Sequence, residues 1–400
     1  MPINKSISNL IQNSNRPTNS DFKQQKLPAW QPILTANSVL PWFFVIGCLF
    51  IPIGIGLLIT SQSVNEFIIE YTHCLANNGQ KCSELIKDLT SNFAYCHCKI
   101  SFSLDRDFKS DVYIYYALTN FYQNHRRYVK SKDDYQLQGK LVPGGLGSNF
   151  IDCEPFAYVN GTVPIAPCGA IANSLFNDSF ELYYRKSADS SIRVDLLRTG
   201  IAWRTDIRIK YKNPPGPSLQ EAFKGTTKPP NWKNPVWELD PTDPENNGFK
   251  NQDLMVWMRT SAFPTFRKLF RRVDHSNGDN HFRRSLPKGN YSVVIKYAYP
   301  VTIFHGTKSI IISNTSWLGG KNAFLGIAYI VTGSFCLILG AVFIVVHKKY
   351  GNKSAFGKNK GSSFDKPIHR KFKESERLFS HSSVTSRAAI SNIPQDVGKT

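Results

Sequence analysis

Two segments of the chain contain no charged residue, and they limit the fold more than any other feature of the sequence. Val39–Thr60 and Ala323–Val346 are 22 and 24 residues long. Because an α-helix rises about 1.5 Å per residue, each segment can cross a hydrocarbon core of about 30 Å. The first segment is also longer than the apolar core of roughly 7 to 15 residues in a signal peptide, so it should remain as an anchor. A fully soluble protein is excluded.

The basic residues predict how these helices cross the membrane. The chain has a net charge of +20, of which residues 1–38 hold +3 and residues 347–400 hold +8. Lys and Arg are in excess on the cytosolic side of membrane helices. We therefore expect a cytosolic tail at 1–38, helices at 39–60 and 323–346, an exoplasmic or lumenal domain at 61–322, and a second cytosolic tail at 347–400.

The two tails hold more than half of the net positive charge, so this charge does not require nucleic acid as a partner. No duplex-reading motif accompanies the basic residues, so nucleic acid is not an expected partner, whereas membrane lipids are. The tail at 347–400 is rich in Ser, Lys and Arg and poor in apolar residues. We expect it to be disordered, with membrane attraction or phosphorylation as its alternative uses.

The membrane segments themselves carry little chemistry. Neither contains Asp, Glu, Lys or Arg, whereas pumps and proton relays place ionisable groups at membrane depth. Small residues recur in both segments, namely Gly47, Gly54, Gly56, Gly326, Gly333, Ser334 and Gly340. Two interpretations stay open: these residues let a neighbouring helix approach closely, or they reflect the general frequency of Gly in membrane helices.

Six cysteines lie between the helices, and an even number suits a disulfide framework in an oxidising compartment. Cys153 and Cys168 stand apart and should close a local loop. The other four are Cys74, Cys82, Cys96 and Cys98. With His97 they could be zinc ligands, but exported thiols normally oxidise, so we expect disulfides. Six cysteines allow fifteen pairings, and spacing alone does not choose among them.

Four N-x-S/T sequons fall in the same exoplasmic region, at Asn160, Asn177, Asn290 and Asn314. Such sequons are glycosylation acceptors in secreted or lumenal domains. Asn314 lies close to the second membrane segment, where the glycosylation machinery has poor access. The sequons at Asn4 and Asn352 should be silent, because the topology places them in the cytosol.

Hydrophobic alternation predicts a largely antiparallel β-sandwich with long loops. The clearest period-2 patterns are at Ile201–Tyr211 and Tyr291–Tyr299. Shorter runs also suit strands, at Lys99–Leu104, Val112–Leu118, Phe180–Tyr184 and Lys308–Ile312. Pro- and Gly-rich connectors separate them. The predicted fold class is thus a membrane protein with two helices flanking a disulfide-braced, glycosylated, mainly antiparallel domain.

Three short patterns resemble known binding motifs, but each has a structural interpretation that fits better. The acidic run Asp240–Gly248 lacks EF-hand spacing and indicates a turn. Gly144–Gly147 lacks the Lys-Ser/Thr of a P-loop and indicates a flexible loop. His125 beside Arg126 and Arg127 could bind an anion, but a surface cluster or a structural ion pair is the better interpretation. No HExxH, GxSxG or paired-carboxylate pattern occurs, so an enzyme is not expected.

The most concentrated charge outside the tails is Arg267–Arg272, joined by Arg283 and Arg284. Such a cluster can face anionic lipid or an acidic partner. The alternative is an ordinary solvated loop.

Five stretches resemble one known family. They are FYQNHRRYVKSKDD at Phe121–Asp134, PIAPCGAIANSLFND at Pro164–Asp178, FKGTTKPPNW at Phe223–Trp232, NNGFKNQDLMVWMRTSAFPTFRKLF at Asn246–Phe270 and SWLGGKNAFLGIAYI at Ser316–Ile330. They closely resemble the cell division control protein 50 family, also called the ligand-effect modulator 3 or transmembrane protein 30 family. The resemblance spans roughly residues 30–350.

The resemblance implies a function that the residues alone do not. It implies a non-catalytic β subunit and chaperone of a type IV P-type ATPase that moves aminophospholipids to the cytosolic leaflet, needed for export from the endoplasmic reticulum. It implies no catalytic residue, metal or cofactor in this chain, and location in the endoplasmic reticulum, Golgi, endosome or plasma membrane. The charge-free helices, with their small-residue faces, would pack against the membrane domain of the ATPase, and the ectodomain would cap its exoplasmic loops.

The resemblance also implies nested disulfides, Cys74 with Cys98 and Cys82 with Cys96, plus Cys153 with Cys168.

Two other classes of protein remain as alternatives. A two-span ligand-gated ion channel subunit has the same topology and a disulfide-rich ectodomain, and a free-standing receptor or adhesion module would need no ATPase.

Overall fold

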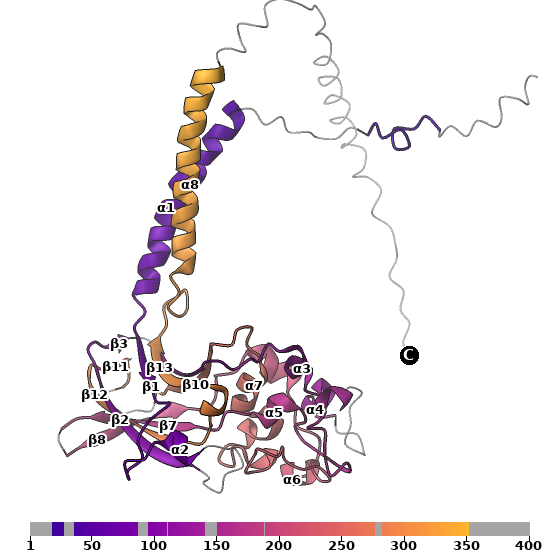
Figure 1. Ribbon diagram of the computed structural model, residues 1–400, viewed down its shortest axis with the longest axis vertical. Coiled ribbons are helices and arrows are strands. Elements are labelled where there is room, and N and C mark those ends of the chain that lie inside the picture. The colour runs from indigo at the N-terminus through magenta and orange to yellow at the C-terminus, as the bar shows by residue number, and fades with distance from the viewer. Residues whose placement is uncertain are drawn as a thin grey trace, which may run out of the picture. The chain divides into compact units, whose positions relative to one another are not determined.

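The structure is a computed structural model that describes residues 18–27, 36–86, 95–109, 111–140, 150–187, 189–276 and 282–351. The two expected membrane segments form helices α1 (Ala36–Gln62) and α8 (Phe324–Val346), and a π-helical turn, η7 (His347–Gly351), continues α8 (Figure 1). Both helices are long and apolar enough to cross a membrane. The loop predicted at Gly144–Gly147, the sequons at Asn4 and Asn352 and most of the C-terminal tail lie outside the described residues.

Between these helices, the described strands form two main antiparallel sheets. The five-stranded sheet has the order β1-β13-β4-β10-β9 and the four-stranded sheet the order β2-β12-β7-β8. Two small ribbons, β11-β3 and β5-β6, accompany them. The strands are β1 (Glu66–Glu70), β2 (Cys96–Leu104), β3 (Phe108–Lys109), β4 (Val112–Leu118), β5 (Tyr158–Val159), β6 (Val163–Pro164), β7 (Ser179–Arg185), β8 (Ser191–Val194), β9 (Leu196–Leu197), β10 (Phe266–Val273), β11 (Ser285–Leu286), β12 (Gly289–Tyr297) and β13 (Lys308–Asn314).

Alternation along β12 shows why these segments are strands. Tyr291, Val293, Ile295 and Tyr297 are buried on one face, while Lys296 points to solvent. Successive side chains of a strand point to opposite faces, so this pattern buries one face in the core. The strand predicted at Tyr291–Tyr299 is confirmed as far as Tyr297, where β12 ends, and the four shorter predicted strands form β2, β4, β7 and β13.

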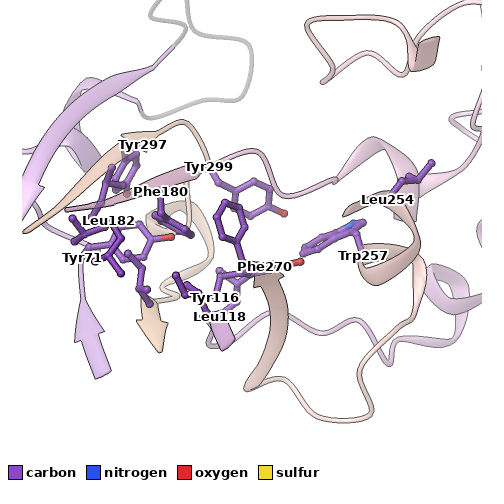
Figure 2. Packing of buried hydrophobic residues seen from close by; sticks show 14 of the residues in the cluster. Tyr71, Tyr116, Leu118, Phe180, Leu182, Leu254, Trp257, Phe270, Tyr297 and Tyr299 are labelled. Carbon is purple, nitrogen blue, oxygen red and sulfur yellow. The ribbon is translucent and has the colours of Figure 1, made fainter. Parts of the chain in front are cut away.

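The core lies between the two sheets and is rich in aromatic rings (Figure 2). Phe180 of the four-stranded sheet meets Phe270 of the five-stranded sheet edge to face, with ring centroids 4.8 Å apart. Tyr71, just after β1, contacts Phe180 and Tyr297 in the same geometry. Such aromatic pairs contribute about 0.5–1.5 kcal/mol beyond the area that they bury. The predicted antiparallel sandwich is confirmed.

One strand prediction is wrong. Residues 201–211 form a π-helical turn, η2 (Asp206–Lys210), rather than a strand. The side chain of Asp206 is buried and pairs with Lys210 at 3.0 Å and with Arg259 at 3.6 Å. The pair of Asp206 with Lys210 joins residues four apart, which a helical turn brings together and a strand would hold about 13 Å apart. Trp203 and Ile209, which the alternation predicts to be buried, are exposed.

Short helices accompany the sheets, and α3, α4, α5, α6 and α7 gather beside them (Figure 1). They are α2 (Cys82–Leu85), α3 (Arg126–Lys130), α4 (Asp134–Leu137), α5 (Ala170–Asn173), α6 (Leu219–Ala222) and α7 (Gln252–Met258), with 3₁₀ turns η1 (Phe150–Cys153), η3 (Val236–Glu238), η4 (Pro244–Asn246), η5 (Gly248–Lys250) and η6 (Thr302–Phe304). The side chain of Asn251 accepts a hydrogen bond from Leu254 N and so begins α7. Trp257 in α7 donates its indole N–H to Ile171 O at 2.8 Å, which fixes α7 on α5.

Three disulfides brace the domain. Cys74 bonds to Cys98, and Cys82 bonds to Cys96, which ties α2 and the segment before it to strand β2. The third bond joins Cys153 to Cys168, in a small separate core with Ala157 and Ile165. These pairs are the ones that the family resemblance implies. The sulfurs of Cys74, Cys82 and Cys98 lie close together, but in disulfides they have no thiolate to offer a metal.

Candidate partner-binding surfaces

Glycines bring α1 and α8 into backbone contact between residues 50–62 and 324–331. A Cβ at Gly54 would lie 2.9 Å from the carbonyl oxygen of Gly326, and a Cβ at Gly326 would lie 2.9 Å from that of Gly54. Neither position accepts a side chain unless the helices move apart. The rings of Phe50 and Tyr329 pack beside this contact, with centroids 4.9 Å apart. Close packing of this kind is what holds helices together in lipid.

The same arrangement holds between residues 36–49 and 332–346. A Cβ at Gly47 would lie 3.0 Å from Gly333 O, and one at Gly340 would lie 3.0 Å from the ring of Phe44. Of the two open interpretations of these glycines, close helix approach is therefore correct. Their neighbour, however, is the other helix of the same chain. The expectation that the small-residue faces contact an ATPase is wrong for these positions.

The outward faces of the two helices are apolar. Large side chains are exposed along both, among them Trp42, Leu49, Ile53 and Ile59 in α1 and Phe335, Ile338, Val342 and Val345 in α8. Neither helix carries a charged residue. Gly56 also has open space around it, with nothing within 4 Å of a Cβ built there. These faces suit lipid tails or the helices of another membrane protein.

A buried ion pair connects the two sheets of the ectodomain. Lys308 of β13 is fully buried, and its amine donates to Asp178 Oδ2 and to Tyr299 O, both at 2.6 Å. Asp178, just before β7, also accepts the Tyr71 hydroxyl at 2.9 Å and two backbone N–H groups. The ammonium lies 3.1 Å from the ring centroid of Tyr297. Burial lowers the pKa of Lys308 to about 8, while Asp178 opposes that shift.

The basic cluster at Arg267–Arg272 is not a solvated loop, which corrects one of its two interpretations. It forms strand β10 inside the five-stranded sheet, paired with β4 and β9. Arg271 is buried and forms a two-pronged ion pair with Asp253 of α7. Arg267 is partly exposed and reaches Glu66 of β1 at 3.2 Å. The neighbouring Arg283 and Arg284 are exposed as well.

Lys268 is the unusual member of this strand. Its amine is buried and donates to the carbonyls of Val256, Trp257 and Arg259 at the end of α7. Burial, and then the charge of Arg259, lower the pKa of Lys268 to about 7. Within the described residues, no carboxylate forms an ion pair with it. The helix end supplies only partial negative charge, so the Lys268 ammonium lacks a full counter-charge within the part of the chain that the structure describes.

Three loops at one end of the five-stranded sheet present exposed apolar side chains. We call Tyr122, Phe263 and Ile303 the apolar tip; Phe263 is 72% exposed. Hydrogen bonds join these loops, from Phe121 N to Pro264 O at 3.0 Å and from Asn120 Nδ2 to Phe304 O at 2.5 Å. The sequence did not single out this set, because its members come from distant loops. A cluster of large exposed apolar groups often marks a protein interface.

The predicted glycosylation sites differ in exposure. Asn160 lies at the turn between β5 and β6, Asn177 precedes β7, and Asn290 lies on β12; all three are exposed. Asn314 is 7% exposed, and its Nδ2 atom donates to Lys109 O at 2.9 Å. Its Oδ1 atom accepts from Asn65 N at 2.8 Å. Because a glycan is attached through Nδ2, this geometry does not suit Asn314 as an acceptor.

The remaining sequence candidates have ordinary structural surroundings. His125 precedes α3, and Arg126 and Arg127 are exposed on that helix. Asp240 is buried, and its carboxylate binds the side chains of Thr242 and Asn246 at 2.6 and 2.9 Å.

Comparison with known proteins identifies the family. The model of the LEM3 (ligand-effect modulator 3) family / CDC50 family matches residues 57–353. Cell cycle control protein 50A of Bos taurus is 52% identical over 340 residues, which cover 85% of this chain and 91% of that protein. Cell cycle control protein 50B of Homo sapiens is 48% identical over 340 residues, which cover 84% and 95%. ALA-interacting subunit 3 of Arabidopsis thaliana is 36% identical over 348 residues, which cover 84% and 87%. With two apolar helices around a disulfide-braced sandwich, and with this match over most of its length, the chain belongs to the LEM3/CDC50 family.

Proposed function

We propose that this chain is the non-catalytic β subunit and chaperone of a type IV P-type ATPase, needed for its export from the endoplasmic reticulum and for aminophospholipid transport to the cytosolic leaflet. The family match over residues 57–353 carries this proposal, and a relative whose name is ALA-interacting subunit 3 supports it. ATP hydrolysis, the phosphorylated aspartate and the lipid path would all belong to the partner.

Two surfaces are available for that partner. The outward faces of α1 and α8 are apolar and free of charge, so they can pack against other membrane helices. The apolar tip of Tyr122, Phe263 and Ile303 offers a second contact, to the exoplasmic loops of the ATPase. In this arrangement both termini are cytosolic, residues 61–322 are exoplasmic or lumenal, and glycans occupy Asn160, Asn177 and Asn290.

The proposal is tested by purifying the tagged chain from native membranes in a mild detergent. We expect a stoichiometric P-type ATPase whose hydrolysis is stimulated by an aminophospholipid. A self-associated chain without an ATPase, giving ligand-evoked current in a bilayer, would instead support the ion channel alternative.

A matched pair of variants tests the apolar tip. Phe263→Asp places a charge in the tip and should reduce the recovered ATPase at least fivefold. Leu75→Asp changes a residue that is also exposed but lies beside the Cys74–Cys98 disulfide, and should leave recovery unchanged. Equal recovery with both variants would leave the helix faces as the contact and exclude the tip.

A further inference from the structure

A pocket of about 300 Å³ opens in the ectodomain between η2, α7 and the start of β10. Its walls include three cations and one carboxylate, together with aromatic and aliphatic side chains; those that matter here are Trp203, Asp206, Met255, Arg259, Arg267 and Lys268. Arg267 and Lys268 belong to the basic cluster that the sequence offers as a contact for anionic lipid or an acidic partner, whereas the other pocket residues were not singled out. Its mixture of cations and apolar walls suits an amphiphilic anion.

Positive charge is in excess in this pocket. Lys268 is only 8% exposed, and it lines the pocket without a carboxylate partner among the described residues. Its lowered pKa shows that the buried charge is unfavourable there. An anion in the pocket would supply the missing counter-charge and raise this pKa.

The two arginines can bind such an anion directly. Arg259 approaches Asp206 at 3.6 Å and stacks on Trp203, with 4.5 Å from the guanidinium carbon to the ring centroid. Arg267 Nη1 lies 3.2 Å from Glu66 Oε2. A guanidinium has five N–H donors, so each arginine keeps donors for a further oxyanion. Their planar geometry matches the oxygens of a phosphate group.

The pocket is also tethered near the ends of the membrane helices. Glu66, the partner of Arg267, is four residues beyond Gln62, the last residue of α1. A Cβ at Gly320 would lie 3.4 Å from Arg267 Nη2, and α8 begins four residues later. Four residues span at most about 14 Å. Arg267 is therefore close to the level at which the chain leaves the bilayer.

We propose that this pocket binds the headgroup of an anionic phospholipid from the leaflet that the ectodomain faces. Arg259 and Arg267 bind the phosphate oxygens, and Lys268 supplies buried positive charge behind them. The exposed ring of Trp203 and the apolar wall at Met255 contact the glycerol and the first acyl carbons. The short tether to both helices favours a lipid over an acidic side chain of a partner. This inference goes beyond the proposed function and does not need the ATPase.

The test is a titration of the full-length chain, in a neutral detergent, with dihexanoyl phosphatidic acid, followed by calorimetry and Trp fluorescence. We expect saturable binding, weakened at least tenfold by Arg259→Gln and by Arg267→Gln. The matched control Arg208→Gln removes an exposed arginine outside the pocket and should change the Kd less than twofold. Trp203→Phe should remove the fluorescence change while calorimetric binding persists. Inorganic phosphate and dihexanoyl phosphatidylcholine should each bind at least tenfold more weakly.

Three results would overturn the inference. Equal weakening by Arg208→Gln and Arg259→Gln would mean general surface attraction. Inorganic phosphate that binds as tightly as the lipid would mean a site for the free ion. A Glu-rich peptide that binds while the lipid does not would assign the pocket to a partner protein.

The proposed function is tested by a separate measurement. Circular dichroism checks folding, and ATPase recovery is measured for every variant. If Arg259→Gln no longer binds the lipid but still recovers the ATPase, the result supports lipid binding by the pocket, independently of the ATPase. If the wild-type protein binds the lipid but recovers no ATPase, the result contradicts only the proposed function.

Discussion

The helix pair and the sandwich keep their parts together by opposite means. Where α1 meets α8, the contacts are made by glycine backbones and apolar rings, with no charged group. Where the two sheets meet, Lys308 and Asp178 form an ion pair inside an aromatic core. Lipid tails are as apolar as the helices, so only close fit favours helix association there. In water the hydrophobic effect favours burial of the rings, and the polar pair fixes how they are arranged.

The largest expected effect comes from breaking the ion pair. Asp178→Ala leaves the Lys308 ammonium buried without its carboxylate, and three other donors to Asp178 lose their acceptor. Removing one partner of a buried pair typically destabilises by about 3–5 kcal/mol. Thermal unfolding of the ectodomain in the full chain, followed by circular dichroism, measures the loss.

The exposed pair of Glu181 with Arg193, at 3.4 Å, is the control. Glu181→Ala should lower the free energy of unfolding by less than about 1 kcal/mol, because water screens this pair. Asp178→Ala together with Lys308→Met should recover part of the loss, since no charge then remains buried. A loss below 1 kcal/mol for Asp178→Ala alone would contradict the role given to the pair.

The sequence predicted the sandwich where one strand's own alternation decides the structure. In β12 every second residue from Tyr291 to Tyr297 enters the core, so the pattern is local and visible. In β10 it is not, because Lys268 and Arg271 are buried by groups that lie 9–18 residues earlier in the chain, in and just after α7. A run of cations therefore suggests solvent exposure, although tertiary partners bury two of them.

The candidate binding surfaces were harder to predict from the sequence than the strands. The apolar tip joins loops around Tyr122, Phe263 and Ile303, and the lipid pocket joins Trp203 to Arg259 and Arg267. No spacing rule connects residues so far apart. The membrane glycines were visible as a pattern, but the sequence did not show that they face each other rather than a second protein.

The second test acts on the helix pair. Gly326→Leu places a side chain against the backbone of Gly54 and Leu58, which cannot rotate away. Overpacking of this kind destabilises a contact by about 1–3 kcal/mol, so the helices should separate. Spin labels at Ile59→Cys and Leu325→Cys, in a chain without Cys48 and Cys336, should show a longer and broader distance distribution.

Gly56→Leu is the matched control, because nothing lies within 4 Å of a Cβ at that position. Its distance distribution should equal that of the unaltered helices, and neither variant should change the melting of the ectodomain. An unchanged distribution with Gly326→Leu would show that the helix contact does not depend on close backbone approach.

A smaller effect depends on pH and separates the two buried lysines. The pKa of Lys268 is about 7 in the folded chain and about 10.4 when unfolded. Between these values the unfolded state binds more protons, so stability rises with pH above about 7 and is lowest below it. Lys268→Met removes this contribution. From pH 6.5 to 8.5, the free energy of unfolding of the wild type should therefore rise by about 1–2 kcal/mol relative to that of Lys268→Met.

Loss of the carbonyl hydrogen bonds in Lys268→Met adds an offset that does not change with pH, so only the trend is diagnostic. Lys308→Met should show its trend at higher pH, because the pKa of Lys308 is about 8. Parallel pH profiles for wild type and Lys268→Met would contradict a depressed pKa at Lys268.

The smallest expected effect concerns the chain between the two regions, where Asn314 ends β13 shortly before α8. Asn160→Gln, Asn177→Gln and Asn290→Gln should each remove one glycan and one step of gel mobility, because these side chains are exposed. Asn314→Gln should not change mobility, since the Nδ2 atom of Asn314 is already bound to Lys109 O. That bond and the one from Asn65 N hold the strand leading to α8 beside the strand leading from α1. A glycan at Asn314 would need Nδ2 to leave Lys109 O, so a mobility step there would mean that this bond is open when the glycan is added.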